Sequence, residues 1–501
     1  MEHNFAHFRE MLGEVIDLQL AAAVLEWDQQ TYMPEAGAQP RAMQLGTLMR
    51  LAHARFVHDD FGAALEQAKT SAAQMDPDSD EAGIVRNVQR EFQRQRRIPS
   101  DWVAEDARTT SLARQAWEKA RAESDFAHFR PHLQKVIELR RQYAGFFAPY
   151  DHVYDPLLDV YEPGMKTAQV RTVFGTLRPQ QVELVRQIAE RGLPVDASML
   201  HRKYAVQKQW DIGVEIITDF GYDFKAGRQD KTAHPFTTTF GVGDVRITTR
   251  HDPDYLPSGL FSTLHEAGHA LYAQGIGPTL DRTPLLAGAS YAVHESQSRM
   301  WENLVGRSRP FWNHYYPRLQ KLFPRALGDV DVESFYRAIN KVERSLIRVE
   351  ADEATYNLHI MLRFEIEIAL LDRSLEVKDL PQAWNQKMQE YLGLTPPDDA
   401  QGVLQDIHWS SGYVGYFPTY ALGNLIALQL WEKIRSEIPD LERQIERGEF
   451  GELLSWLRQN IHRHGGKFEP ADLVRRVTGS AITSEPYLRY LRSKYGEIYK
   501  L

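Results

Sequence analysis

Apolar residues recur at helical spacing through most of the chain. Between residues 5 and 25, the apolar positions three or four residues apart are Phe8, Met11, Leu12, Val15 and Ile16. This spacing is typical of a helix that buries one face. Similar patterns cover residues 82–97, 102–123 and 126–147. The pattern therefore predicts a mainly α-helical protein.

One segment departs from the helical pattern. Residues 234–250 read HPFTTTFGVGDVRITTR, and Thr alternates with apolar residues on both sides of Gly241-Val242-Gly243-Asp244. A period of two around a glycine-rich turn predicts a β-hairpin.

The breaks between these patterns are short, such as Asp76–Asp80 and Glu162–Gly164, and no low-complexity tract or Ser/Gly linker separates them. With 501 residues, 43% of them hydrophobic, the chain can bury a large core. We expect residues 1–501 to form a single domain, in one or two lobes.

Composition narrows the class of protein. Lys and Arg number 59 against 68 Asp and Glu, a net charge of −9, which gives no reason to expect nucleic acid or an anionic membrane as partner. The chain has no cysteine, which excludes disulfides and thiolate metal sites. It begins without a signal-peptide pattern, and no apolar run reaches about 18 residues, so we expect a cytoplasmic protein.

The segment His265-Glu266-Ala267-Gly268-His269 matches the pattern HExxH. On a helix, His265 and His269 share one face and can reach one metal ion, and Glu266 is placed to take a proton from water. Chance produces such a string in roughly one protein in twenty of this length, so other groups must support it. Ser258 is the expected N-cap of this helix, and Gly275 or Gly277 its end.

A tetrahedral zinc ion with two histidines needs a third ligand and a water, and without cysteine that ligand is His or a carboxylate. Glu295 fits, because it is separated from His269 by twenty-five residues and lies at the start of a second amphipathic segment that runs on through Leu304. The alternative for Glu295 is an ordinary helix carboxylate. His294 could contact substrate, support a ligand or simply be packed. Two histidines and a glutamate would make a catalytic site.

These residues resemble the M32 metallocarboxypeptidases, the thermostable or Taq-type carboxypeptidases. The segments that carry the resemblance, in the family's order, are 244–248 (DVRIT), 265–269 (HEAGH), 294–297 (HESQ), 347–352 (IRVEAD) and 402–409 (GVLQDIHW). Residues 27–34, 161–165 and 478–479 also look like the family. The resemblance runs over nearly the whole chain and implies one catalytic domain.

The resemblance implies a nearly all-helical fold like that of neurolysin and angiotensin-converting enzyme. In that fold two lobes line a deep groove, and a small β-hairpin or sheet lies near the active site. It also implies a zinc enzyme, with cobalt able to substitute, that removes single C-terminal amino acids with broad specificity and disfavours proline. A cytoplasmic homodimer is expected.

A carboxypeptidase must bind a free α-carboxylate, and the guanidinium fork of arginine does so through two hydrogen bonds. Arg348 is the candidate, and the resemblance points to it as well. The alternative is a charged helix face formed by Arg344, Arg348, Glu350 and Asp352. Asp352, one turn after Arg348, is expected to orient Arg348 or another site group.

Residues 408–420 are rich in hydrogen-bond donors, and their spacing resembles the thimet oligopeptidase and neurolysin family. By that analogy His408 contacts substrate and Tyr420 donates to the oxyanion, with Tyr413 or Tyr416 as substitutes and Tyr413 also a substrate contact. At least one of the three tyrosines is expected to have only a structural role, in aromatic core packing. Asp406 could hold the tautomer of His408 or cap a helix.

Two further features are given structural interpretations. Asp244 and Arg246 are expected to form a pair that shapes the hairpin, and the hairpin either offers a strand edge to an extended peptide or has no substrate role. The turn His462-Arg463-His464-Gly465-Gly466 is expected to carry exposed histidines and no metal.

The resulting hypothesis is a zinc carboxypeptidase acting on peptides with a free C-terminus. Zinc held by His265, His269 and Glu295 lowers the pKa of its bound water towards about 7, and Glu266 moves the proton from water to the leaving amine. The rivals are an endo-acting oligopeptidase and a non-catalytic peptide-binding protein with a structural metal.

Overall fold

The computed structural model describes residues 2–501, with side chains from Phe5 onward. The chain is mainly helical, as predicted, and it divides into two compact units. Unit 1 comprises Met1–Arg96, Asp196–Ile339 and Leu430–Gly479, and unit 2 comprises Arg97–Val195, Asn340–Gln429 and Ser480–Leu501. Each unit is therefore built from stretches that lie far apart in the sequence.

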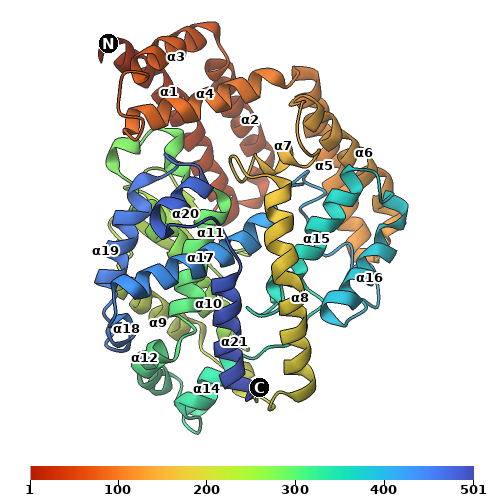
Figure 1. Ribbon diagram of the computed structural model, residues 1–501, viewed down its shortest axis with the longest axis vertical. Helices are drawn as coiled ribbons and strands as arrows, with labels where there is room; N and C mark the ends of the chain where they lie inside the picture. Colours follow the sequence, from red (N-terminus) through yellow and green to blue (C-terminus); the bar gives the residue numbers. More distant parts are fainter. Residues whose placement is uncertain (1) are drawn as a thin grey trace. The chain divides into compact units, whose positions relative to one another are not determined.

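Unit 1 contains the N-terminal helices (Figure 1) and the three strands that the described residues form. Its helices are α1 (Glu2–Thr31), α2 (Ala38–Phe56), α3 (Asp59–Ala72), α4 (Asp80–Arg97), α9 (Val206–Asp219), α10 (Leu256–Gln274), α11 (Tyr291–Arg299), α12 (Arg309–Leu322), α13 (Pro324–Leu327), α14 (Val332–Ile339), α18 (Leu441–Glu446), α19 (Gly451–Asn460) and α20 (Pro470–Thr478). A π-helical stretch, Met300–Val305, directly follows α11.

Among the described residues, unit 2 consists of helices joined by irregular segments and contains no strand. Its helices are α5 (Ser100–Glu123), α6 (Phe126–Gly145), α7 (Asp155–Leu158), α8 (Thr167–Arg191), α15 (Tyr356–Leu371), α16 (Leu380–Leu392) and α21 (Glu485–Tyr499). Helix α17 (Pro418–Glu437) begins in unit 2 and ends in unit 1. In unit 2, α15 packs against α8 and α16 (Figure 1), and nearly all of its residues are buried.

The predicted hairpin is present, and it belongs to a larger sheet than expected. Strand β2 (Thr237–Thr239) pairs antiparallel with β3 (Val245–Thr249), and Thr238 lies opposite Arg246. Strand β1 (Gly227–Lys231) adds in parallel on the other side of β3, so the order is β1-β3-β2. Its sequence GRQDK has neither the alternation nor the β-branched residues of a strand signal.

The boundaries of the HExxH helix differ from the expectation at one end. Helix α10 begins at Leu256, with Tyr255 at the N-cap position and no side-chain cap, so Ser258 lies inside the first turn rather than capping it. Pro257 in that turn has no N–H to leave unpaired. The helix ends at Gly275, as predicted. Because fourteen residues of α10 are buried, packing rather than capping sets its position.

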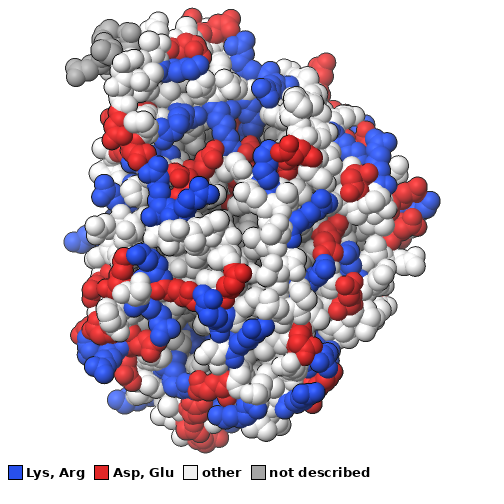
Figure 2. Space-filling model, in the orientation of Figure 1, with Lys and Arg blue, Asp and Glu red and all other residues white. Residues whose placement is uncertain are grey.

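Acidic and basic side chains are interspersed over the face drawn in Figure 2. Among the described residues, no helix combines the length and the apolar character needed to cross a membrane.

Candidate metal centre and active site

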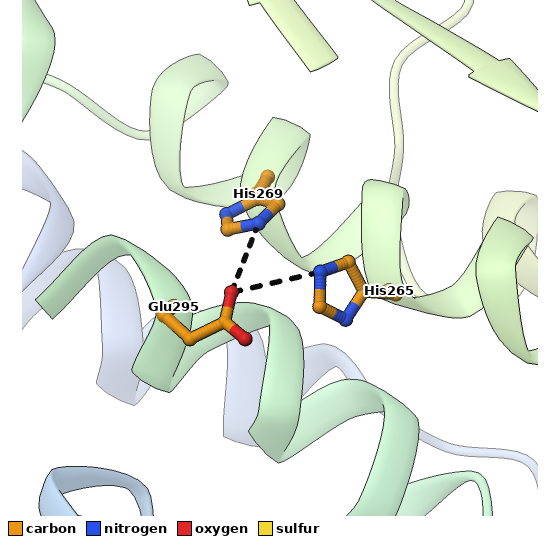
Figure 3. Close-up of side chains that lie close together, drawn as sticks. All are labelled: His265, His269 and Glu295. Carbon is orange, nitrogen blue, oxygen red and sulfur yellow. Dashed lines mark ion pairs between the residues drawn. The ribbon is translucent and has the colours of Figure 1, made fainter. Parts of the chain in front are cut away.

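Three predicted metal ligands come together in unit 1. His265 and His269 project from α10, and Glu295 projects from α11 (Figure 3). The Oε2 atom of Glu295 lies 3.6 Å from Nε2 of His265 and 3.5 Å from Nε2 of His269. One ligand atom from each of the three residues lies within 4.8 Å of the others. Three donor atoms therefore converge on one point, as a metal ion requires.

A glycine allows α10 and α11 to approach this closely. Gly268 lies within the HExxH pattern, and a Cβ atom there would meet the Cα of Ser298 at 2.6 Å and the carbonyl oxygen of Gln297 at 2.7 Å. Both are backbone atoms of α11, which a side chain could not displace without moving that helix. The absence of a side chain at Gly268 thus lets Glu295 reach the two histidines.

Both histidines are held through their other ring nitrogen. Nδ1 of His265 lies 2.9 Å from Oε2 of Glu302, and Nδ1 of His269 lies 2.6 Å from Nδ1 of His294. Such contacts fix the ring and leave Nε2 as the available donor to a metal. His294 therefore supports His269, one of the roles considered for it.

The sequence analysis missed Glu302 and Arg299. Arg299 donates through Nε to Oε1 of Glu295 at 2.7 Å and through Nη1 to Glu302 at 3.2 Å. Because Arg299 occupies Oε1 of Glu295, only Oε2 faces the histidines. The sequence did carry a signal for both residues. Glu295, Arg299 and Glu302 are charged residues at helical spacing within an otherwise buried segment, and buried charges need partners.

The electrostatics of the cluster favour a cation. Burial raises the pKa of Glu295, but Arg299 and the two histidines more than offset it and hold the pKa well below its usual range. The pKa of Glu302 is lowered to about 2, because Arg299, His265 and Arg307 outweigh burial. Burial lowers the pKa of His265, but the neighbouring Glu295 and Glu302 outweigh burial and raise it above its usual value. Ionised carboxylates beside these imidazoles fit a divalent metal ion.

The candidate base, Glu266, is buried next to the histidines and is held by the sheet. The hydroxyl of Thr237 in β2 donates to Oε2 of Glu266 at 2.6 Å and lies 3.0 Å from its carbonyl oxygen. One carboxylate oxygen of Glu266 thus has a fixed partner. Sequence reasoning treated the hairpin either as a strand edge for a peptide or as a structural element without a substrate role, and did not anticipate a contact with Glu266.

The remaining predicted residues lie in unit 2, and Arg348 is at their centre. Its Nε and Nη2 atoms lie 3.0 and 2.9 Å from Oδ1 of Asp406, and Nη1 donates to the hydroxyl of Tyr356 at 3.0 Å. Arg363, which is fully buried, donates to Oδ2 of Asp406 at 2.6 Å. One carboxylate therefore bridges two guanidinium groups, and Arg363 was missed by the sequence analysis.

The structure contradicts the alternative considered for Arg348 and the pairing considered for Asp352. Residues 344–352 do not form a charged helix face, because the chain there is irregular apart from one 3-10 turn, Arg348–Glu350. Asp352 does not pair with Arg348. It accepts hydrogen bonds from the backbone N–H groups of Glu343 and Ala354 and from Thr355, and burial raises its pKa to about 6. Asp352 shapes the turn after Arg348.

His408 and Tyr420 are neighbours in unit 2. Nε2 of His408 lies 3.3 Å from the hydroxyl of Tyr420, and the Arg348 guanidinium lies 5.1 Å from the Tyr420 ring centre. Burial lowers the pKa of His408 to about 4, so its ring is neutral at neutral pH. Asp406 lies 3.9 Å from Nδ1 of His408, too far for the tautomer-fixing hydrogen bond considered for it.

The three tyrosines differ in their surroundings. Tyr413 is 51% exposed, whereas Tyr416 packs edge-on against Tyr161 at 5.1 Å and against Tyr420 at 5.2 Å between ring centres. Tyr416 is thus the tyrosine most engaged in packing, in line with the expectation that one of them is structural.

Asp244 and Arg246 form the expected pair. Arg246 donates through Nε and Nη2 to the two oxygens of Asp244 at 2.8 and 2.7 Å. The same guanidinium stacks 4.4 Å from the ring of Trp27, which ties the end of α1 to the hairpin. Residues 27–34 and 244–248, which both resemble M32 segments, therefore meet.

The histidine turn carries no metal cluster among the described residues. The expectation that its histidines are exposed is wrong for His462, which is fully buried and lies 2.9 Å from the side-chain oxygen of Gln297. This contact joins the turn to α11.

A helix pair that presents two histidines and a glutamate, with a buried glutamate beside the first histidine, is the arrangement of a catalytic rather than a structural metal site. The comparisons with known proteins agree with this class. The model of the Carboxypeptidase Taq (M32) metallopeptidase family matches residues 7–495. The chain therefore belongs to the M32 family and is a metallocarboxypeptidase.

Individual relatives cover nearly the whole chain. Thermostable carboxypeptidase 1 of Thermus thermophilus is 44% identical over 507 residues, covering 99% of both chains, and carboxypeptidase 1 of Bacillus subtilis is 38% identical, covering 99% of this chain and 98% of the relative. The crystal structure of the M32 carboxypeptidase from Deinococcus radiodurans superimposes with a TM-score of 0.96 at 41% identity, covering all of both chains.

Proposed function

We propose that this enzyme is a zinc carboxypeptidase that releases single amino acids from peptides with a free C-terminus, with broad specificity and little action on proline. The observation that carries the proposal is the buried cluster of Arg348, Arg363 and Asp406, in which two guanidinium groups share one carboxylate. The resemblance to M32 enzymes supplies the breadth of specificity and the disfavour for proline.

The charge count in this group favours an anionic ligand. Arg348 and Arg363 share the single carboxylate of Asp406. Burial lowers the pKa of His408 to about 4 and that of His359 well below its usual range, so neither ring adds charge. Burial raises the pKa of Glu367 to about 7, although nearby Arg363 partly opposes this rise. The Glu367 carboxyl is therefore only partly ionised at neutral pH.

A substrate carboxylate would balance the remaining charge. Nearly complete burial strengthens the field of Arg348, and nearby Asp406 raises the pKa of its guanidinium, so Arg348 stays protonated. Its guanidinium fork matches a carboxylate, and recognition of a chain end through such a fork is what separates an exopeptidase from an endopeptidase.

The residues in unit 1 fit a zinc ion. His265, His269 and Glu295 are the donor set of many catalytic zinc sites, and imidazole with carboxylate also suits cobalt. When bound, the ion would act as a Lewis acid that polarises the scissile carbonyl and acidifies water. Glu302, His294 and Arg299 hold the three ligand side chains in place.

Glu266 would move the proton in the reaction. Its carboxylate accepts a proton from the attacking water and passes it to the leaving amine, which a buried glutamate held at one oxygen by Thr237 can do without turning away. In unit 2, the Tyr420 hydroxyl is the candidate donor to the oxyanion, and His408 and the exposed Tyr413 are candidate substrate contacts.

Family resemblance also leads us to propose a homodimer located in the cytoplasm. Sedimentation velocity of the purified enzyme would give a dimer, and a concentration-independent monomer would contradict this part of the proposal.

The decisive experiment compares a peptide with its C-terminal amide. The amide lacks the charge that Arg348 would bind, and we expect its kcat/KM to fall by a factor of about 10 to 100, the worth of a hydrogen bond to a charged group. Arg348→Gln should remove the same factor from the free peptide and little from the amide. Arg344→Gln, in the same loop, is the matched control and should keep the preference.

Mass spectrometry of the products would identify the cleaved end. A ladder that loses one residue at a time from the C-terminus supports the proposal. Equal cleavage of acid and amide, with internal fragments, would indicate an endo-acting oligopeptidase. Stoichiometric zinc without any hydrolysis would indicate a binding protein.

A further inference from the structure

Glu367 in α15 is a fully buried carboxyl group that accepts three hydrogen bonds. The indole Nε1 of Trp409 donates to Oε1 at 2.8 Å. The hydroxyl of Tyr154 and the backbone N–H of Gly415 donate to Oε2 at 2.6 and 3.0 Å. All four residues belong to unit 2. Neither the predicted mechanism nor the metal chemistry involves Glu367.

Two of the three donors bracket a functional loop. Residues 408–416, which we call the His408 loop, carry His408, Tyr413 and Tyr416, and the loop has no regular secondary structure. Trp409 follows His408 directly, and Gly415 precedes Tyr416. One carboxyl group therefore holds both ends of the His408 loop. The backbone N–H of Tyr413 donates to the carbonyl oxygen of His408 at 2.9 Å, which closes the turn between them.

The third donor ties the same loop to α7. Tyr154 is the N-cap residue of α7, and Gly415 adopts a φ of +97° against that helix. A Cβ atom at Gly415 would lie 2.7 Å from the carbonyl carbon and oxygen of Leu157. Both the positive φ and the close backbone approach require glycine there. The His408 loop is thus pressed against α7 in one conformation.

We propose that Glu367 is a positioning residue that holds the His408 loop, and so places the His408 ring beside Tyr420. The inference rests on the proposed function, in which His408 and Tyr420 face the substrate. The His408 ring lies 4.5 Å from the Phe417 ring and 5.6 Å from the Tyr416 ring between centres. The direction of the ring therefore depends on how the loop enters and leaves this aromatic group.

A carboxyl group suits this role better than its amide. Three donors point at Glu367, and each buried donor needs an acceptor. Glutamine keeps one carbonyl oxygen but sets an NH₂ group against either Trp409 or the Tyr154–Gly415 pair. Glu367→Gln therefore leaves at least one buried donor unpaired and loosens one end of the loop.

The test compares Glu367→Gln and Tyr154→Phe with Tyr316→Phe. Tyr154→Phe deletes one hydroxyl outside the loop and keeps the ring. Tyr316 is an equally buried tyrosine in unit 1, whose hydroxyl donates to the carbonyl oxygen of Val330 at 2.8 Å, so its phenylalanine variant matches the lost hydrogen bond. Steady-state kinetics on a free-acid peptide and thermal unfolding would be measured for each variant.

We expect kcat to fall about tenfold in Glu367→Gln and severalfold in Tyr154→Phe, with KM changed less than twofold. Tyr316→Phe should lower the melting temperature comparably to Tyr154→Phe and leave kcat unchanged. If Tyr154→Phe loses stability but keeps full kcat, Glu367 is only a structural residue and the inference is wrong. This comparison holds even if Glu367→Gln does not fold.

His408→Ala separates a failure of the inference from a failure of the proposed function. Loss of kcat in His408→Ala together with full kcat in Tyr154→Phe contradicts the positioning role alone. Full kcat in His408→Ala contradicts the proposed role of His408, and the inference fails with it.

Discussion

At the scale of single residues, the metal centre depends on side chains that would not touch the ion. Arg299 takes one oxygen of Glu295, and Glu302 takes the Nδ1 of His265. The ligand atoms converge because these partners leave them one free direction. The HExxH pattern predicted two ligands and the base from spacing alone. Glu302 could not be assigned in the same way, because its contact with His265 joins two helical segments 37 residues apart in sequence.

The first prediction concerns Glu302. Glu302→Gln keeps the size of the side chain but removes the charge that faces His265, so we expect metal affinity to fall about 10- to 100-fold. Titration of the apoenzyme against a competing chelator would measure this. Glu333→Gln, which removes a half-exposed partner of Arg309, is the control and should leave affinity unchanged. Equal affinity in both variants would show that Glu302 does not support His265.

At the scale of elements, the loop that carries Arg348 is held by the last helix of the chain. The backbone N–H of Val342 donates to the hydroxyl of Tyr499 at 2.7 Å. At the other end of the loop, the carboxylate of Glu353 accepts hydrogen bonds from Lys494 at 2.8 Å and from Tyr495 at 3.0 Å. Helix α21 thus fastens both ends of an irregular segment. Sequence reasoning left a charged helix face open as the alternative here, because the distant partners on α21 cannot be read from local spacing.

The second prediction tests this attachment. Lys494 and Glu353 are both buried, and breaking such a pair by Lys494→Met leaves an unpaired carboxylate, at a cost of about 3 to 5 kcal/mol in the free energy of unfolding. Urea unfolding would measure it. The reciprocal exchange Lys494→Glu with Glu353→Lys should recover part of the loss. The hydroxyl of Tyr490 also donates to Glu353, at 3.2 Å. No recovery would mean that the hydrogen bonds from Tyr490 and Tyr495, rather than the ion pair, dominate the stabilisation.

At the scale of the whole molecule, buried ionisable groups give the enzyme opposing responses to pH. Burial raises the pKa of Glu367 to about 7 and that of Asp352 to about 6. A carboxyl whose pKa is higher in the folded state stabilises the fold at low pH, and this contribution is lost as pH rises through the folded pKa. Buried histidines such as His408 and His462, whose pKa values are lowered, act in the opposite direction.

The third prediction isolates the contribution of Glu367. As pH rises from 4.5 to about 7, the raised pKa of Glu367 should lower the free energy of unfolding of the wild type by up to ~3 kcal/mol. Glutamine makes no such contribution, because it does not titrate. The difference in unfolding free energy between wild type and Glu367→Gln should therefore shift in favour of the variant as pH rises. Parallel pH profiles of the two proteins would show that folding does not raise the pKa of Glu367.

The amino-acid sequence by itself determined the features that depend on local spacing. Helical periodicity gave the long helices, alternation around a glycine-rich turn gave the hairpin, and HExxH with the absence of cysteine led to His265, His269 and Glu295. Each of these follows from residues a few positions apart, or from what the composition excludes. The family signatures extended this to the class of enzyme.

Only the tertiary structure decided which side chains support the chemistry. Thr237 holds Glu266, Arg363 shares Asp406 with Arg348, and Glu367 joins both ends of the His408 loop. These partners lie between 29 and 48 residues apart in sequence. No periodic pattern links such positions. Burial forces their polar groups to find partners, and the packing of helices far apart in the chain selects which partners are in reach.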